Sequence, residues 1–295
     1  MADKIRFGVI GGSGVYSIEA LQDVQEIEID TPFGKPSDAY ITGSLDGIRV
    51  AFLPRHGRGH RITPTELNSR ANIYGFKSLG VQYLISVTAV GSLRQDYAPL
   101  DIVIPNQIYD RTRNREREYT FFGNGIVAHV GFADPFCLDL NAILYDTAKQ
   151  SGAHVHNGGT LVVIEGPMFS TKAESNINRQ LGCDLVGMTA VPEAKLAREA
   201  EMGYSAIAMV TDYDVWHDSH ETVTADMVVQ SLRTNAEMGK RILRAALPRA
   251  ASELQDCTCL HSLQDAIVTD PNTIPPETRA RMELLVGKYL PTAHA

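Results

Sequence analysis

Residues 204–216 read YSAIAMVTDYDVW. The apolar and small residues of the first half, which end at a polar threonine, are typical of a buried β-strand. Directly after this run, the acids Asp212 and Asp214 stand two positions apart, and Trp216, the only tryptophan of the chain, follows them. The stretch therefore predicts a central strand that carries functional carboxyl groups at its end.

Further short, β-branched runs alternate with longer amphipathic segments along the chain. The predicted strands are Arg6–Ile10, Tyr40–Leu45, Ile48–Leu53, Tyr83–Val87, Ile102–Pro105, Thr160–Glu165, Leu185–Met188 and Ala206–Thr211. Asp46 and Gly47 readily adopt the positive φ angles of a tight turn, so they predict a hairpin between the second and third of these strands. The alternation predicts a single α/β domain of three layers, in which helices cover both faces of a mixed, mostly parallel sheet.

Capping patterns mark the predicted helices. Thr63-Pro64-Thr65-Glu66 and Thr171-Lys172-Ala173-Glu174 both place a glutamate three residues after a capping threonine. The first pattern predicts a helix that runs to Gly80, and the second predicts one that stops at Gly182. Three more helices are predicted over Pro135–Gln150, Val191–Met202 and Ala225–Leu247, the last of them ended by Pro248.

Composition excludes several classes of protein. The 295 residues carry a net charge of -8, whereas a nucleic-acid surface needs clustered Lys and Arg. The N-terminal apolar run is too short for a signal peptide, and no segment reaches the length of a membrane span, so we expect a cytosolic protein without membrane contact.

The spacing of Cys137, Cys183, Cys257 and Cys259 fits no zinc site and favours free thiols over a Cys257–Cys259 bridge. The arginines at 111, 113, 115 and 117 are interleaved with Glu116 and Glu118, which favours a solvated loop over a phosphate or partner contact.

The carboxyl ends of the predicted strands share a polar character, and ligands bind at such ends in open α/β sheets. Glycines and Ser13 follow the first strand, and their N–H and hydroxyl groups could surround a small oxyanion. The alternatives are a structural turn or a dinucleotide-binding site. The third glycine of the dinucleotide-binding pattern is replaced by Ser17. Arg55 offers a planar fork that matches phosphate, or else an ordinary ion pair. Thr88 and Thr189 add hydroxyl donors, or are merely buried threonines. Together these residues indicate a phosphate site.

The two acids can act in three ways. In an extended backbone Asp212 and Asp214 would project to the same face. First, they could hold a divalent metal, but no third acid has a fitting spacing, so we predict no metal site. Second, they could cap a helix or face solvent. In a partly dry site, like charges raise the pKa of one carboxyl group and keep it protonated near neutral pH. An acid beside bound phosphate predicts phosphorolysis of a purine nucleoside, and an aspartate, which accepts from an exocyclic amine, suits adenine.

An ordered series of motifs carries a resemblance to a known family. These motifs are IGGSG, DTPFGKPSD, RHGRGH, ANIY, TAVGSL, LDIVIP, ADPFC, EGPMFST, MTAVPEAKLA and TDYDVWH, and they run through about the first 250 residues. The chain resembles the purine nucleoside phosphorylase family, and within it the members that cleave methylthioadenosine. The resemblance implies phosphorolysis of S-methyl-5'-thioadenosine to adenine and 5-methylthioribose 1-phosphate, with inorganic phosphate as co-substrate, no cofactor and a homotrimeric assembly.

The resemblance also implies a role for each site residue. The expected phosphate ligands are Ser13, Arg55, His56, Thr88, Ala89 and Thr189. The expected nucleoside contacts are Met188 at the ribose, Phe169 on the purine, His129 offered across a subunit interface toward the methylthio end, and the catalytic pair Asp212 and Asp214 at the base. Ser170 and Ala225 occupy positions that tune nucleoside preference.

The chain departs from the family pattern in two places. Relatives often carry arginine where this chain has Met168 and Lys172. The resemblance fades beyond residue 250, so we expect a phosphorylase domain over residues 1–250 and a C-terminal extension over 251–295 that packs on it. Three other functions remain open: a 6-oxopurine nucleoside or methylthioinosine phosphorylase of the same fold, a nucleosidase that uses water, and a non-catalytic nucleotide-binding protein.

Overall fold

The strands of the chain form one mixed sheet in a computed structural model that describes residues 5–12, 20–115, 118–217 and 225–291. They are β1 (Phe7–Gly11), β2 (Gln22–Ile27), β3 (Tyr40–Leu45), β4 (Ile48–Pro54), β5 (Tyr83–Ser92), β6 (Ile102–Ile104), β7 (Gln107–Asp110), β8 (Val155–Asn157), β9 (Thr160–Val163), β10 (Leu185–Gly187) and β11 (Gly203–Asp212). The main path runs β2-β3-β4-β1-β5-β10-β9-β7, and a branch joins β5 to β11, β6 and β8. Parallel pairs join β1 to β4 and β5, and β5 to β11, which brings the carboxyl ends of these four strands to one edge.

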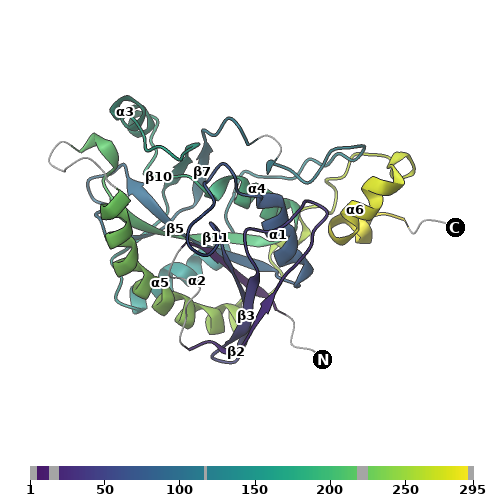
Figure 1. Cartoon of the computed structure of the whole chain (residues 1–295), viewed down its shortest axis with the longest axis horizontal. Helices are drawn as coiled ribbons and strands as arrows, with labels where there is room; N and C mark the ends of the chain where they lie inside the picture. The colour runs from purple at the N-terminus through teal and green to yellow at the C-terminus, as the bar shows by residue number, and fades with distance from the viewer. Residues whose placement is uncertain (1–4, 13–19, 116–117, 218–224, 292–295) are drawn as a thin grey trace.

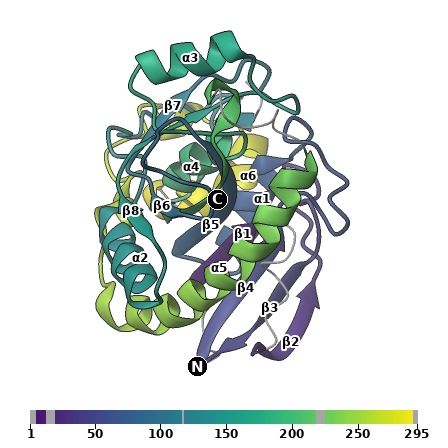
Figure 2. The ribbon, with the colours of Figure 1, turned by 90° about the vertical axis from the view of Figure 1, so that its left-hand side faces the viewer.

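Helices cover both faces of this sheet (Figures 1 and 2). They are α1 (Ser69–Ser78), α2 (Leu138–Gln150), α3 (Lys172–Gln180), α4 (Ala190–Glu199), α5 (Ala225–Glu253) and α6 (Pro276–Val286), with short 3-10 turns at Asp214–Trp216, Thr258–His261, Pro271–Thr273 and Gly287–Tyr289. One hydrophobic cluster joins α2 and α5 to the sheet, and a second joins α1, α4 and α6 to its other face. The predicted three-layer α/β/α fold with a mixed, mostly parallel sheet is confirmed.

All eight predicted strands are present, with some different ends. Asp46 and Gly47 have φ angles of 48° and 83°, which confirms the hairpin turn between β3 and β4. However, β5 continues to Ser92, so Thr88 and Ala89 lie within this strand rather than after it. The strands β2, β7 and β8 were not predicted. Their residues are polar or few in number, and β2 in particular is almost entirely exposed, so hydrophobic periodicity could not reveal it.

Several helix ends differ from the sequence prediction; α2 begins three residues later than predicted and α4 ends three residues earlier. The Thr63–Glu66 pattern closes an isolated turn, and α1 begins only at Ser69, where the Asn68 side chain accepts a hydrogen bond from the backbone of Ala71. Pro248 lies inside α5 instead of ending the helix, which runs on to Glu253. The remaining capping prediction is confirmed, because Thr171 and Glu174 form a complete capping box at the start of α3.

The C-terminal helix α6 packs against the core of the protein. Met282, Leu285 and Val286 of α6 are buried in the same cluster as Ile10 and Leu53 from the ends of β1 and β4. All four cysteines are free, as the sequence predicts. No helix in the described ranges has both the length and the apolar character needed to cross a bilayer.

Candidate active site

Four described segments carry most of the predicted site residues, and each belongs to or directly follows a strand of the central sheet. Arg55 and His56 follow β4, Thr88 and Ala89 lie in β5, Met188 and Thr189 link β10 to α4, and Asp212 ends β11. The hydrogen bond from the Arg55 backbone N–H to the Gly11 carbonyl, 2.9 Å, joins the ends of β4 and β1. Ser13, which follows Gly12, lies outside the described residues, as does the side chain of Ala225.

Arg55 is held in a buried ion pair. Its side chain is 2% exposed, and its Nε and Nη2 donate to the two carboxylate oxygens of Glu193 at 2.5 and 3.1 Å. Nη2 also donates to the Ser86 hydroxyl at 2.6 Å, and Nη1 donates to the Val87 carbonyl at 3.2 Å. The planar fork that the sequence analysis assigned to phosphate is therefore turned toward Glu193. Only Nη1 has a hydrogen that these contacts do not use.

His56 is a neutral donor and acceptor at physiological pH. Burial, together with the positive charge of Arg55, lowers the pKa of the imidazole to about 4. Its Nδ1 lies 2.8 Å from the Ile62 carbonyl, which only an N–H can satisfy, so the proton of the neutral ring belongs on Nδ1. Nε2 is then an acceptor, suited to a protonated phosphate oxygen or a sugar hydroxyl rather than to a bare anionic oxygen.

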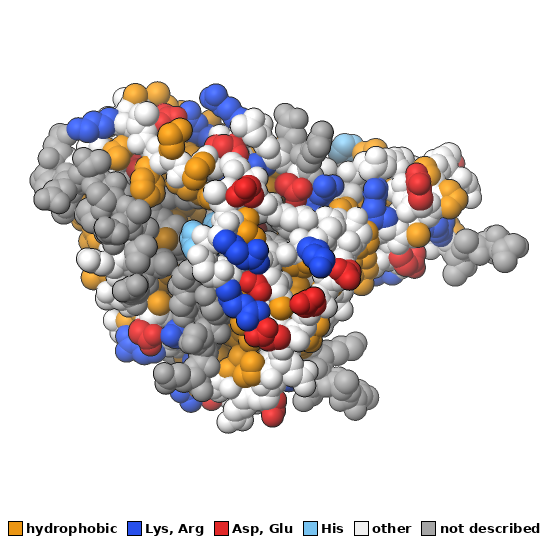
Figure 3. Space-filling model, viewed as in Figure 1, with side chains coloured by type: hydrophobic (Ala, Val, Ile, Leu, Met, Phe, Trp, Pro, Cys, Tyr) orange, Lys and Arg blue, Asp and Glu red, His pale blue; other side chains and the backbone are white. Residues whose placement is uncertain are grey.

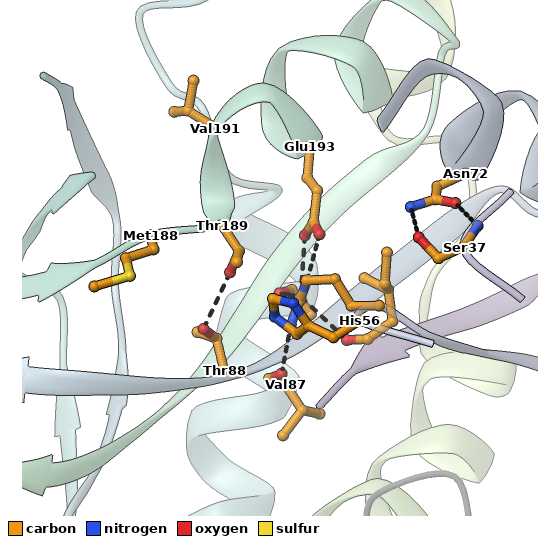
Figure 4. Close-up of polar contacts among 12 residues, drawn as sticks. Ser37, His56, Asn72, Val87, Thr88, Met188, Thr189, Val191 and Glu193 are labelled. Atoms are coloured by element: carbon orange, nitrogen blue, oxygen red, sulfur yellow. Dashed lines mark hydrogen bonds and ion pairs between the residues drawn. The ribbon is translucent and has the colours of Figure 1, made fainter. Parts of the chain in front are cut away.

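Two threonines meet beside this pair. Thr88 and Thr189 are both buried, and their hydroxyl oxygens lie 3.4 Å apart. Figure 4 shows Thr88 and Thr189 pointing toward one another, with Glu193 reaching from α4 on the side of His56. The structure thus brings together four of the six predicted phosphate ligands, Arg55, His56, Thr88 and Thr189, and Ala89 adjoins them in β5.

The acid pair is buried and tightly connected. Asp212 accepts hydrogen bonds from the Thr211 hydroxyl at 2.7 Å and from the Asp214 backbone N–H at 2.8 Å. β11 ends at Asp212 and Asp214 opens a 3-10 turn, so the alternation expected from an extended backbone is wrong here. A left-handed φ of 50° at Asp214 turns the chain back, and the two acids become neighbours in this way instead.

Burial gives these acids the proton affinity that acid catalysis requires. It raises the pKa of Asp212 despite the two hydrogen bonds that favour ionisation. It raises the pKa of Asp214 to about 6; the Ser175 hydroxyl offsets the increase in part, and the charge of Asp212 adds to it. The Oδ2 atom of Asp214 has no hydrogen-bond partner among the described residues. This oxygen is itself buried, so the closed turn holds it away from solvent.

The surroundings of the acids leave little space. A Cβ atom on Gly91 would lie 3.1 Å from Asp212 Oδ1 and 3.3 Å from Asp214 Cβ, so only a glycine fits there without movement. Trp216 anchors the turn, because its indole N–H donates to the Ser92 carbonyl at 2.8 Å and the Arg179 guanidinium lies 3.7 Å from its ring centre. This anchoring role explains the single tryptophan beside the acids.

The loop after β9 carries three more predicted residues. Met168 and Phe169 are exposed, whereas Ser170 is buried and its hydroxyl lacks a hydrogen-bond partner in the described part of the chain. Met188 lies below this loop, since a Cβ on Gly166 would stand 2.6 Å from its sulfur. The loop therefore packs against Met188 at Gly166 and carries a buried Ser170 next to an exposed Phe169.

Arg115 is buried rather than solvated, in contrast to the sequence interpretation of the arginine cluster. It donates to the backbone carbonyls of Met188 and Val191 at 2.6 and 2.8 Å, and to the side chain of Glu165 at 3.2 Å. Arg111 is also engaged, with Asn178 at 2.6 Å. Arg115 thus fastens the loop after β9 to the segment that carries Met188 and Thr189.

A cavity of about 290 Å³ lies next to these residues. Its walls are Pro64, Thr65, Leu67, Ser69, Arg113, Asn114, Arg115, Glu118 and Pro192. The acids do not line it. Pro192 and Arg115 connect it to the segment of Met188 and Thr189, so it lies toward these residues rather than toward the acids.

His129 lies apart from this group. It is exposed, and its backbone N–H donates to the Ala266 carbonyl at 2.9 Å. Within the described residues, no hydrogen bond or ion pair joins it to the other predicted site residues.

Sequence reasoning missed the residues that support the site. Glu193, Ser86, Thr211, Ser175, Gly91 and Arg115 position the predicted groups. Only Gly91 and Thr211 adjoin predicted residues in the sequence, in AVGS and VTDYD, and could have been noticed. Glu193 sits on an ordinary-looking amphipathic helix, where nothing marks it as the partner of a buried arginine.

On the face shown in Figure 3, Lys and Arg side chains lie beside Asp and Glu side chains instead of forming one basic surface. Exposed ion pairs of this kind include Arg58 with Glu26 at 2.8 Å. This mixture agrees with the net charge of -8 and with a small-molecule ligand.

Comparisons with known proteins agree with this arrangement. The profile of the family described as the phosphorylase superfamily matches residues 6–248. The S-methyl-5'-thioadenosine phosphorylase of Geobacter sulfurreducens is 56% identical over 96% of this chain and 98% of its own length. A crystal structure of a methylthioadenosine phosphorylase from an antarctic soil metagenomic library superposes with a TM-score of 0.91 at 45% identity, over 96% of this chain and 99% of that one. The Schistosoma mansoni methylthioadenosine phosphorylase in complex with adenine gives a TM-score of 0.82 at 35% identity, over 96% of this chain and 98% of the other. This chain belongs to the phosphorylase superfamily.

Proposed function

We propose that this chain catalyses the phosphorolysis of S-methyl-5'-thioadenosine to adenine and 5-methylthioribose 1-phosphate. The observation that carries the proposal is the buried pair of Asp212 and Asp214, whose pKa values are both raised, at the edge where Thr88, Thr189 and His56 meet. The relatives named S-methyl-5'-thioadenosine phosphorylase, which match nearly the whole chain, support this substrate.

In the proposed reaction, phosphate attacks the anomeric carbon as the bond from this carbon to the adenine breaks. We assign phosphate to the group of Ser13, Arg55, His56, Thr88, Ala89 and Thr189. The sugar in the transition state resembles an oxocarbenium ion, which the negative charge of phosphate stabilises. Since Glu193 already neutralises Arg55, we assign to Nη1 of Arg55 a single hydrogen bond to phosphate, while the threonine hydroxyls provide the others.

The leaving adenine takes up a proton on its imidazole-ring nitrogen. We assign this proton to the pair of Asp212 and Asp214, whose pKa values are both raised by burial. The ionised partner accepts a hydrogen bond from the exocyclic amine of adenine. A 6-oxopurine presents a carbonyl oxygen at that place, which an ionised carboxylate repels, so the acid pair favours adenine over inosine or guanosine. Phe169, Met188 and Ser170 complete the nucleoside side, and Ala225 adjusts its preference.

The proposal predicts that release of adenine from methylthioadenosine requires phosphate. We expect Asp212→Asn to lower kcat by roughly 10² to 10⁴, because general acid catalysis usually contributes that much. Asp256→Asn is the matched control, since Asp256 is an exposed acid that pairs with His261 outside the site. The measurement is adenine formation with and without phosphate. Equal release of adenine in phosphate-free buffer would instead identify a nucleosidase, and binding without turnover would identify a nucleotide-binding protein.

We further propose a cytosolic homotrimer in which His129 of one subunit approaches the methylthio group bound by its neighbour. The exposure of His129, away from the acids of its own chain, supports this assignment. Light scattering coupled to gel filtration should give three times the mass of 32.3 kDa. A monomer with full activity would rule out any role for a second subunit.

A further inference from the structure

A cluster outside the proposed active site brings together Asp101, His154 and His156. His154 Nδ1 lies 2.8 Å from one carboxylate oxygen of Asp101, and His156 Nε2 lies 2.7 Å from the other. The three potential ligand atoms all lie within 4.8 Å of one another. Two imidazole nitrogens therefore lie on either side of one carboxylate, each beside a different oxygen.

The fold holds two of these ligands in place. Asp101 is buried just before β6, where its carboxylate also accepts a hydrogen bond from the Ala98 backbone at 2.9 Å. His156 lies in β8 opposite Val103 of β6, and its ring stacks on Tyr97 with the ring centres 4.1 Å apart. The Arg94 guanidinium lies over the outer face of Tyr97, 4.6 Å from the ring centre.

His154 supplies the open side of the cluster. It lies two residues before His156, so the alternation of an extended chain puts both rings on one face. Its side chain is 74% exposed, in contrast to 18% for His156. A small ion can therefore reach the group from solvent, while two of the three ligands stay fixed by packing.

We infer that Asp101, His154 and His156 form a binding site for a divalent transition metal ion of the zinc type. Imidazole nitrogen and carboxylate oxygen are the ligands that Zn²⁺, Co²⁺ and Ni²⁺ accept, and three protein ligands leave the remaining positions to water. On binding, the ion takes the place of the protons that now lie between each ring and the carboxylate. Each imidazole stays neutral, with its proton on the other ring nitrogen.

A second cluster must be separated from this one in any test. Cys137, Cys257 and Cys259 bring three thiols together in the hydrophobic core, and all three are buried. Thiolates prefer softer ions and give cobalt an intense thiolate-to-metal charge-transfer absorption, which nitrogen and oxygen ligands do not give. The absorption spectrum of bound cobalt therefore reports which cluster holds the ion.

The test uses full-length protein that is stripped with a chelator and titrated with ZnCl₂ by calorimetry in phosphate-free buffer. We expect one equivalent of zinc that binds at least ten-fold more weakly to His154→Gln, and likewise to Asp101→Asn if this buried variant folds. His261→Gln is the matched control, because His261 is also a partly exposed histidine paired with one aspartate, and its affinity should match the wild type. Zinc at a hundred-fold excess over Kd should raise the Tm of the wild type and the control by roughly 5 °C, but not that of His154→Gln.

Three outcomes would overturn the inference. These are equal zinc affinity in His154→Gln and the wild type, a thiolate-to-cobalt absorption in the cobalt-loaded protein, and no binding at high micromolar zinc. All variants should retain phosphate-dependent turnover of methylthioadenosine, since none of these residues is in the proposed active site. The test therefore stays independent of the proposed function.

Discussion

At the scale of single residues, burial decides the charge state of the site. Asp214 keeps a proton more readily than an exposed aspartate, because the carboxylate loses hydration on burial. The hydrogen bonds that it gains stabilise the carboxylate by less than this loss destabilises it. His56 loses its proton for the same reason. Arg55 stays charged in the same environment because Glu193 accepts two of its hydrogen bonds. One dry edge of the sheet thus contains an acid with a raised pKa, a neutral imidazole and an arginine paired with a carboxylate.

The raised pKa of Asp214 predicts a pH-dependent loss of stability. The folded protein binds this proton up to about pH 6, whereas an unfolded aspartate releases it near pH 3.8, so stability falls as the pH rises through this window. We expect Asp214→Asn to become more stable than the wild type by about 3 kcal/mol above pH 6, because each pKa unit corresponds to 1.36 kcal/mol. Urea unfolding at pH 4, 5, 6 and 7 measures the difference between the two proteins.

The test needs the difference in unfolding free energy between Asp214→Asn and the wild type at each pH. The lowered pKa of His56 increases stability between about pH 4 and 6.5 in both proteins, and it would mask the effect of Asp214 in either one alone. Two stability curves that run parallel from pH 4 to pH 7 would show that the pKa of Asp214 is not raised. A more stable but less active variant would fit an acid retained for its function.

At the scale of the elements, identical capping patterns have different outcomes. Thr171 opens α3, whose first turn carries Ser175 toward Asp214. Thr63 makes two of these contacts with Glu66, but the Glu66 backbone N–H donates to the Thr63 carbonyl instead of its hydroxyl, and no helix begins there. Leu67 and Asn68 separate the Thr63 turn from α1. The Asn68 side chain, rather than Thr63, caps the first turn of α1.

This contrast predicts different costs for the same substitution. Thr171→Ala should lower the stability of α3 by about 1 kcal/mol, because it leaves a backbone N–H of the first turn without its cap. Thr63→Ala should change the exchange of α1 amides very little, because α1 has its own cap. Hydrogen exchange of residues 172–180 and 69–78 in the two variants measures both effects. Equal protection of α3 in Thr171→Ala and the wild type would mean that packing on the acid turn, rather than the cap, holds this helix.

At the scale of the whole molecule, the C-terminal segment completes the core. We propose that residues 251–295 pack on residues 1–250 and unfold together with them. The apolar side chains of α6 fill the cluster beneath α1 and α4, and α5 runs through residue 250 without a break. The alignment with the Geobacter sulfurreducens relative covers 96% of the chain and therefore includes most of this segment.

Two neighbouring leucines of α6 test this packing. Leu285 is 2% exposed and Leu284 is 39% exposed. Leu285→Ala should lower the free energy of unfolding of the protein by about 2–5 kcal/mol in a single cooperative transition, because it leaves a cavity in the shared core. Leu284→Ala is the control and should cost less than about 1 kcal/mol. A separate early transition in Leu285→Ala would show that the extension unfolds independently of the body.

The sequence alone determined the order of the elements, the layered α/β fold and most of the proposed site. These features depend on local signals: apolar runs mark β4, β5 and β11, a capping box marks α3, and polar residues stand near the carboxyl ends of the strands. Because the parallel strands β4 and β11 end at one edge, the sequence positions of Arg55 and Asp212 were enough to predict that both lie there, whereas Thr189 follows β10, which runs antiparallel to β5.

Only the tertiary structure decided the chemical state of these residues. The pairing of Arg55 with Glu193 spans 138 positions, and the contact of Arg115 with the Met188 carbonyl spans 73, so no local pattern announces either. The cluster of Asp101 with His154 and His156 arises only where β6 and β8 pair. Charge state, pKa and metal affinity depend on distance and on the exclusion of water, and these are set by packing between segments that are remote in the sequence.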